Sequence, residues 1–280
     1  MVLEKPRVIS RAPLELNPNF SQAYSRMIAN LSTERIRGVL LDIEGTTTPI
    51  SFVHTTLFSY ARAELKEFLT VNWNTPEVAA DLAGLHAEHA ADVRRNLQPP
   101  PLELATPDGV SSTIAYVNWL MDVDRKSTTL KSLQGKIWRE GYLSRTLLAE
   151  MFSDVAPALR RWQKAGLSVN IFSSGSVLAQ RLLFAHTQDG DLTDTIDNYF
   201  DTTIGPKTES ESYQRIAQSV RLPAQEILFI SDVSAELAAA KLAGMPALLC
   251  VRPGNATTEG DEPFETIRTF ENLLTGPYEN

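Results

Sequence analysis

Two acidic residues, Asp42 and Glu44, follow a short apolar run and are the best candidates for chemistry in this chain. The run, residues 38–41, suits a strand that is buried on both faces, which places the Asp42 carboxylate at the strand's C-terminal edge. Open α/β sheets bind their ligands at that edge. Gly45 then permits a sharp turn, and the three threonines at 46–48 supply hydroxyl and N–H groups suited to an anion. The alternative interpretation is an ordinary strand that ends in a polar turn.

Three later strand ends carry polar side chains in the same way. They deliver Ser173 and Ser174, then Lys207, then Asp232, and a helical pattern follows each of them. A hydroxyl-rich turn at a helix N-terminus favours a bound anion. Taken singly, the serines suit helix capping and the lysine a surface charge, but the ordered set predicts a phosphate site. Glu236, one helical turn beyond Asp232, is predicted to contact the waters of a bound metal.

These residue types suit hydrolysis of a phosphomonoester through a phosphorylated enzyme. A phosphate dianion repels an attacking carboxylate, and one Mg2+ per chain, held by Asp42, Asp232 and the main-chain oxygen of Glu44, would offset that repulsion. Asp42 would then attack phosphorus, while Ser173 and Lys207 hold the transferring oxygens. Glu44 would protonate the leaving oxygen and later activate water.

The string DIEGTTTPISFV, residues 42–53, resembles the nucleophile motif of the haloacid-dehalogenase phosphatases. In full it resembles one branch of them, the bifunctional enolase-phosphatases (acireductone synthases) of methionine salvage. Most phosphatases of the superfamily have Asp two residues after the nucleophile, so Glu44 departs from the general pattern but matches this branch. The resemblance covers residues 37 to 256, approximately, and it also implies that Lys207 holds phosphate and that Ser174 contacts the substrate.

The resemblance implies a two-step reaction. The branch enolises 2,3-diketo-5-methylthiopentyl 1-phosphate and then removes the phosphate, which gives the acireductone 1,2-dihydroxy-3-keto-5-methylthiopentene. The sequence does not identify the base that takes the carbon-bound proton. One alternative is a haloacid-dehalogenase phosphatase that acts on another small phosphomonoester. Another is a non-catalytic ligand-binding protein on the same fold, against which the intact Asp42, Lys207 and Asp232 argue.

The elements that position these residues alternate between strand and helix, which predicts a doubly wound, Rossmann-like parallel sheet in an α/β protein. Only helical patterns occur over 53–148, so we expect an all-helical cap inserted after the first strand and lying over the site. Residues 37–52 and 149–280 would form the phosphatase core, and 1–36 an N-terminal arm. In the cap, residues 124–131 (DRKSTTLK) suit either a solvated turn or a loop that faces the phosphate. The expected strands are 38–41, 167–172, 199–202, 226–230, 246–251 and 266–269, and the expected helices are 52–69, 76–96, 111–124, 155–164, 177–185, 211–220 and 234–243.

The bulk composition fits a packed enzyme with a small-molecule phosphorylated substrate. The 280 residues are 43% hydrophobic, and the formal net charge of -8 disfavours nucleic acid or an anionic membrane as a partner. Cys250 is the single cysteine, so no intrachain disulfide can form, and no apolar run approaches membrane-spanning length. We therefore expect a cytoplasmic protein and a monomer.

Overall fold

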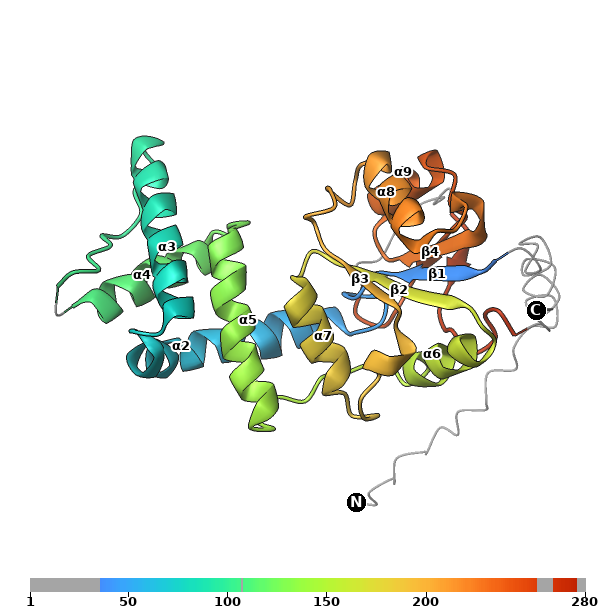
Figure 1. Cartoon of the computed structure of the whole chain (residues 1–280), viewed down its shortest axis with the longest axis horizontal. Helices are drawn as coiled ribbons and strands as arrows, with labels where there is room; N and C mark the ends of the chain where they lie inside the picture. The colour runs from blue at the N-terminus through green and yellow to red at the C-terminus, as the bar shows by residue number, and fades with distance from the viewer. Residues whose placement is uncertain (1–35, 107, 256–263, 276–280) are drawn as a thin grey trace, which may run out of the picture.

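Six parallel strands form one sheet at the centre of the core (Figure 1). The computed structural model describes residues 36–106, 108–255 and 264–275, so the predicted N-terminal arm lies almost wholly outside the described residues. The strand order is β3-β2-β1-β4-β5-β6, and every neighbouring pair is parallel. This order confirms the predicted doubly wound sheet. The strands are β1 (Gly38–Leu41), β2 (Ser168–Phe172), β3 (Asn198–Phe200), β4 (Ile227–Ser231), β5 (Ala247–Cys250) and β6 (Thr266–Ile267).

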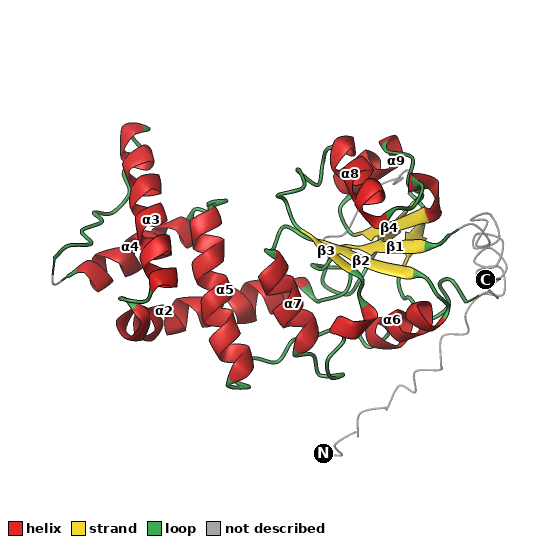
Figure 2. Ribbon diagram, viewed as in Figure 1, coloured by secondary structure: helices red, strands yellow, loops and turns green. Residues whose placement is uncertain are grey.

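Helices cover both faces of the sheet, which explains why β1 is apolar along its whole length (Figure 2). Leu41 packs in one buried cluster with Phe184. Leu40 points to the opposite face and packs in a second cluster with Tyr213. The helices are α6 (Val155–Lys164) and α7 (Val177–Ala185) on the first face, and α8 (Ser210–Val220) and α9 (Ser234–Leu242) on the second.

The chain reverses its direction of winding between β1 and β4. From β1 the chain passes to β2 and β3 on one side, and it returns through α8 to β4, which pairs with the other edge of β1. In such sheets the crevice outside the C-terminal ends of the two central strands is the usual ligand site. Asp42 follows β1 and Asp232 follows β4, so both predicted acids lie at this crevice.

A group of helices lies between β1 and β2 in the sequence and beside the core in space (Figure 1). The described residues between these two strands contain no other strand, which confirms a helical insertion; its exact bounds, 53–148, remain a prediction. Helix α5 packs against α2 and α3 and also against α7 of the core, so it joins the insertion, here called the cap, to the sheet. The cap contains α2 (Phe58–Asn72), α3 (Pro76–Arg94), α4 (Gly109–Asp122) and α5 (Thr128–Leu143).

The connection from the core to the cap differs from the single α-helix predicted over 52–69. It opens with a π-helical turn, Phe52–Leu57, in which the N–H of Phe58 binds the carbonyl of Val53, and α2 follows. The indole of Trp138, on α5, donates to the main-chain oxygen of Leu57 at 2.8 Å. A side chain of α5 therefore supports this turn, and turns of this kind occur often beside functional sites.

Buried polar contacts fix the remainder of the cap. Ser127 caps α5 by accepting from the N–H of Leu130, and Arg125, just before it, forms an ion pair with the buried Asp92. Tyr116 donates to the other oxygen of Asp92 at 2.9 Å. These contacts fix the segment 124–131 rather than leaving it as a free turn. None of the helices in the described part of the chain is long and apolar enough to cross a membrane.

Candidate active site

Asp42 extends β1 by one residue into the crevice. Its N–H donates to the carbonyl of Ile230 at 3.0 Å, which continues the pairing of β1 with β4, and its side chain is buried. The loop that follows closes on itself. The N–H groups of Thr46, Thr47 and Thr48 all lie within hydrogen-bonding distance of the carbonyl of Ile43, at 2.9–3.2 Å. The Asp42 carboxylate thus lies at the end of a strand, and these hydrogen bonds fix the conformation of the loop that follows it.

Gly45 is required in this loop for two reasons. Its φ of +70° lies in the left-handed region, and a Cβ at this position would lie 2.7 Å from Cγ of Asp232. The Asp232 carboxylate therefore packs directly against the backbone of the Asp42 loop. This close approach brings the carboxylates at the ends of β1 and β4 to the same crevice, as predicted.

Three residues from distant parts of the chain hold the loop from behind, and no sequence pattern predicted them. Arg252 donates to the carbonyl of Thr46 at 3.1 Å and forms a buried ion pair with both oxygens of Asp154 at 2.9 Å. Asn255 donates to the carbonyl of Gly45 at 2.9 Å. The only sequence signal was that Arg252 and Asn255 follow the predicted strand at 246–251.

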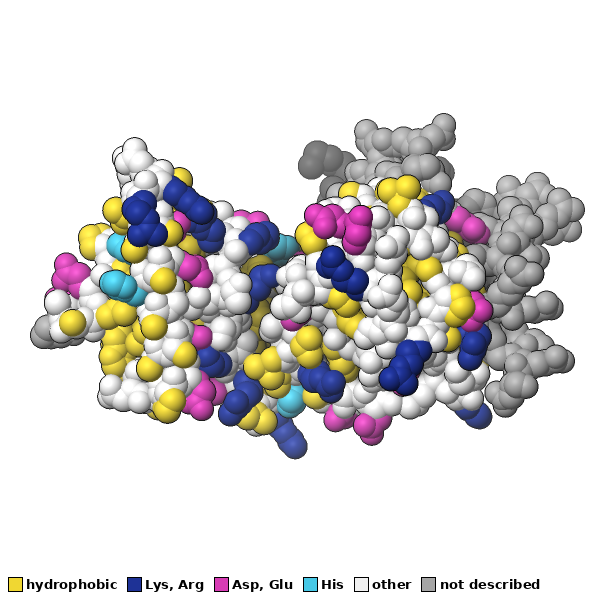
Figure 3. Space-filling view, turned by 45° about the horizontal axis from the view of Figure 1, so that its top comes forward, with side chains coloured by type: hydrophobic (Ala, Val, Ile, Leu, Met, Phe, Trp, Pro, Cys, Tyr) yellow, Lys and Arg dark blue, Asp and Glu magenta, His cyan; other side chains and the backbone are white. Residues whose placement is uncertain are grey.

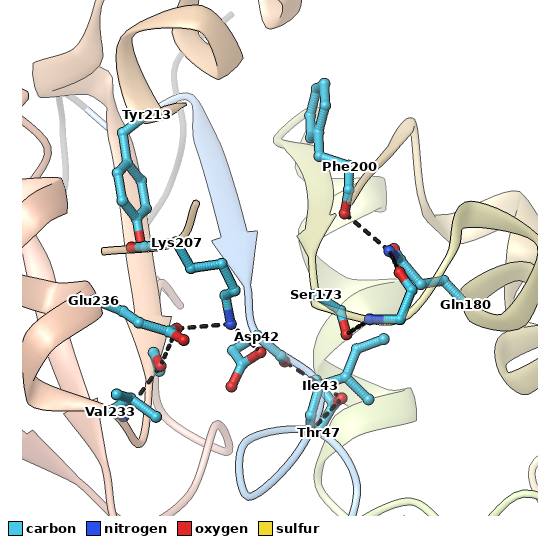
Figure 4. A network of polar contacts seen from close by, with 12 residues as sticks. Asp42, Ile43, Thr47, Ser173, Gln180, Phe200, Lys207, Tyr213, Val233 and Glu236 are labelled. Atoms are coloured by element: carbon cyan, nitrogen blue, oxygen red, sulfur yellow. Dashed lines mark hydrogen bonds and ion pairs between the residues drawn. The ribbon is translucent and has the colours of Figure 1, made fainter. Parts of the chain in front are cut away.

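Lys207 reaches Asp42 across 165 residues of sequence (Figure 4). Its Nζ lies 2.6 Å from Oδ1 of Asp42 and 2.6 Å from Oε2 of Glu236, and the lysine side chain is 9% exposed. Burial lowers the pKa of Lys207, but the charges of Asp42 and Glu236 outweigh it and raise the pKa above its usual value. The lysine is therefore a fixed cation beside the predicted nucleophile.

Glu236 has two partners that the sequence did not predict. Its carboxylate binds Lys207 and accepts from the hydroxyl of Ser231 at 3.0 Å, so it orients the lysine, and its contact with a metal's waters remains a prediction. Burial and the charge of Asp42 raise the pKa of Glu236 to about 7, because one lysine cannot neutralise two carboxylates. The sequence correctly placed Glu236 in the first turn of α9, near the edge of the sheet. Its partner could not be predicted, because that depended on the position of Lys207 in the folded chain.

Ser173 and Ser174 lie where the chain leaves β2 for α7. The hydroxyl of Ser173 accepts from the N–H of Gly175 at 3.1 Å, which tightens the turn (Figure 4). Gln180 of α7 donates to the carbonyls of Gly175 and Phe200, both at 2.8 Å, and so fixes the turn against β3. The structure thus brings both serines to the same sheet edge as Asp42.

The concentration of acids at this edge suits a divalent cation. Burial and the charge of Asp42 raise the pKa of Asp232 to about 7, and the same two causes raise the pKa of Glu44. The described residues contain no cluster of three or more His, Cys, Asp or Glu side chains arranged to bind a metal. Mg2+ needs no such cluster, because one or two carboxylates, a carbonyl and several waters satisfy it.

The carbonyls of the Asp42 loop differ in whether they are free to bind a metal. Those of Gly45, Thr46 and Thr47 accept hydrogen bonds from Asn255, Arg252 and the N–H of Phe152. No described donor binds the main-chain oxygen of Glu44. The donors predicted for Mg2+, which are the carboxylates of Asp42 and Asp232 and this oxygen, therefore fit the ion.

A cavity of about 590 Å³ lies between the cap and this edge of the core. Glu44, Ser173 and Ser174 line it from the core side, whereas Asp42, Lys207 and Asp232 are not part of its wall. Lys126 and Lys131 line it from the cap, so the segment 124–131 faces the cavity, although Asp124 and Lys126 are also exposed to solvent and α5 begins at Thr128. Figure 3 shows a notch between the two lobes with dark blue basic side chains beside it.

Part of the cavity wall is apolar. Its apolar side chains include Leu57, Phe58, Leu130, Trp138 and Leu183, which come from the connection, the cap and α7. A small molecule with both a charged group and an apolar group therefore matches the mixed polarity of this wall.

Comparison with known proteins agrees with this geometry. The family model of the haloacid dehalogenase-like hydrolases matches residues 36–244. Enolase-phosphatase E1 of Synechococcus elongatus is 48% identical over 85% of this chain and 98% of its own length. A probable bifunctional methylthioribulose-1-phosphate dehydratase/enolase-phosphatase E1 of Arabidopsis thaliana is 42% identical over 85% of this chain and 48% of its own length. The crystal structure of the UTR4 protein of Saccharomyces cerevisiae superposes with a TM-score of 0.71 at 34% identity, covering 85% of this chain and all of that one.

Proposed function

Because the chain belongs to the haloacid dehalogenase-like hydrolases, and within them to the enolase-phosphatases, we propose that it converts 2,3-diketo-5-methylthiopentyl 1-phosphate to the acireductone 1,2-dihydroxy-3-keto-5-methylthiopentene in methionine salvage. The observation that carries this proposal is that a charged catalytic centre and a partly apolar cavity lie next to each other. A carboxylate with a fixed lysine lies at the sheet edge, and a cavity with several apolar side chains in its wall lies beside it.

The plant relative supports the choice of substrate. Its name joins an enolase-phosphatase to a dehydratase that acts on methylthioribulose 1-phosphate. Loss of water from such a sugar phosphate leaves a diketone with the phosphate and the methylthio group still in place. The apolar wall of Phe58, Leu130 and Trp138 suits the methylthio end of that molecule.

In this proposal each residue at the sheet edge has a separate task. Asp42 is the nucleophile, and Lys207 and Ser173 hold the phosphoryl oxygens. Glu44 gives a proton to the leaving oxygen and then activates water, which suits a carboxyl group with a raised pKa. Ser174 contacts the substrate from the same turn as Ser173.

One Mg2+ per chain, bound by Asp42, Asp232 and the main-chain oxygen of Glu44, would offset the repulsion between the phosphate and the attacking carboxylate. We also propose that the protein acts as a monomer in the cytoplasm. Sedimentation of the purified protein would test the oligomeric state.

The test is product analysis with the diketo phosphate and Mg2+, in which phosphate release and enol absorbance are followed separately. Both products are expected, and a chelator should stop the release of phosphate. Release of phosphate from other small phosphomonoesters at higher kcat/KM, without any enol from the diketo compound, would favour the alternative phosphatase.

A further inference from the structure

The cavity has several cationic side chains in its wall, and their ion pairs distinguish them. Among the described residues that line it, three cations are already matched to carboxylates of the cap: Arg62 to Asp122, Arg125 to Asp92 and Lys126 to Asp124. A cation that is already paired offers less of its charge to a ligand.

Lys131 differs from these three. Its Nζ donates to the main-chain oxygen of Ser174 at 2.8 Å, and no described carboxylate lies within ion-pair distance of it. The side chain lies in the cavity wall and joins the first turn of α5 to the turn that holds Ser173 and Ser174. A partly buried ammonium group with a neutral partner retains most of its capacity to bind an anionic oxygen.

The electrostatic surroundings of Lys131 are consistent with such a role. Burial, and then the charge of Lys126, lower its pKa below the usual value for lysine, while Asp201 and Glu44 act in the opposite direction. The charge of Glu44, on the core side of the cavity, thus acts on Lys131, on the cap side.

We propose that Lys131 binds the ketone oxygen next to the phosphate-bearing carbon and stabilises the enolate formed in the first half of the reaction. This inference rests on the proposed function. The acireductone has its double bond between carbons 1 and 2, so the proton that leaves is on carbon 1, which also carries the phosphate ester oxygen. The electrons of that C–H bond form the new double bond, and the carbonyl pair moves onto the oxygen at carbon 2.

The cavity wall also indicates where the protons go. Its described carboxylates are Glu44 and Asp124, and Asp124 is exposed and paired with Lys126. Glu44 therefore receives the proton from carbon 1, and the ammonium of Lys131 donates one to the enolate oxygen. Glu44 can then return its proton to the leaving oxygen on the same carbon, and Lys131 is reprotonated by water.

The experiment compares two substrates in four proteins: the wild type, Lys131→Met, Lys131→Arg and, as the matched control, Lys66→Met, which changes an exposed lysine of α2 outside the cavity wall. The diketo phosphate must be enolised before hydrolysis, whereas pentyl phosphate, of similar length but without ketones, needs only hydrolysis. We expect Lys131→Met to lower kcat/KM for the diketo phosphate by about 10²-fold, the usual effect of losing one donor to a developing oxyanion. Its activity on pentyl phosphate should stay near that of the wild type. Lys131→Arg should recover part of the loss, and Lys66→Met should change little with either substrate.

A second measurement separates this role from simple docking of the cap through Ser174. With substrate deuterated at carbon 1, Lys131→Met should show a larger isotope effect on phosphate release than the wild type, because proton removal becomes limiting. Equal losses of activity on both substrates, or an unchanged isotope effect, would overturn the inference. Lys131 would then be a lysine that binds the phosphate or has only a structural role. A wild-type enzyme that hydrolyses pentyl phosphate but forms no enol would refute the proposed function itself, and this inference with it.

Discussion

The contact between Gly45 and Asp232 provides a sharp test of how the site holds its metal. Gly45→Ala places a Cβ 2.7 Å from Cγ of Asp232, and an ordinary contact begins at 3.4 Å. Oδ2 of the same carboxylate would lie closer still, so the carboxylate or the loop must move by more than 3.4 − 2.7 = 0.7 Å. A shift of this size in a catalytic group can reduce activity by about 10²-fold.

The same substitution adds backbone strain, and this second effect needs its own control. An alanine held at positive φ costs about 1–2 kcal/mol. Gly190, at φ +92°, lies in a turn after α7, and a Cβ added there would meet no atom within 4 Å. Gly190→Ala should therefore lose the same stability without displacing Asp232.

The assay is a Mg2+ titration of phosphate release, together with urea unfolding of each variant. Both variants are expected to lose about 1–2 kcal/mol of unfolding free energy from the strain at positive φ. Gly45→Ala alone should need far more Mg2+ and turn over more slowly. A wild-type Mg2+ dependence in Gly45→Ala would refute the placement of Asp232 in the metal site, as would an equal change in Gly190→Ala.

Three other perturbations test individual residues. Glu44→Gln should bind Mg2+ nearly normally while phosphate release slows by about 10²–10⁴-fold, and unimpaired release would reject Glu44 as the catalytic acid. Lys207→Ala should raise KM and lower kcat. It should also lower the free energy of unfolding by about 3 kcal/mol or more, because Asp42 and Glu236 lose their shared cation. Normal stability by urea unfolding would contradict this reasoning. The raised pKa of Asp232, about 7 against an ordinary value of 3.8, means that the folded protein binds this proton more tightly than the unfolded chain does. Metal-free protein should therefore lose stability as the pH rises from 3.8 to about 7, and thermal melts of Asp232→Asn should show a weaker pH dependence.

The sequence by itself determined the sheet and the edge at which the site lies. A strand buried on both faces must be apolar along its length, so residues 38–41 were found with the correct bounds, as were α6 and α7. Parallel strands bring their C-terminal ends to one edge, and this placed Asp42, Ser173 and Asp232 together without any knowledge of contacts. Residue types in that order predicted a phosphate site, and the resemblance of residues 42–53 to the enolase-phosphatases added the enolisation step.

The tertiary structure decided which side chains meet. The sequence placed Glu236 one turn beyond Asp232, but only the arrival of Lys207 from another loop made it a partner of that lysine. Arg252 reaches the Asp42 loop across 206 residues, and no local pattern encodes such a contact. Helical and strand periods fix the face on which a residue lies, because they follow from local backbone geometry. The residues that lie opposite that face depend on how separate elements dock. Lys131, for example, contacts the turn at Ser174 and lines the cavity beside it only because α5 packs against the core.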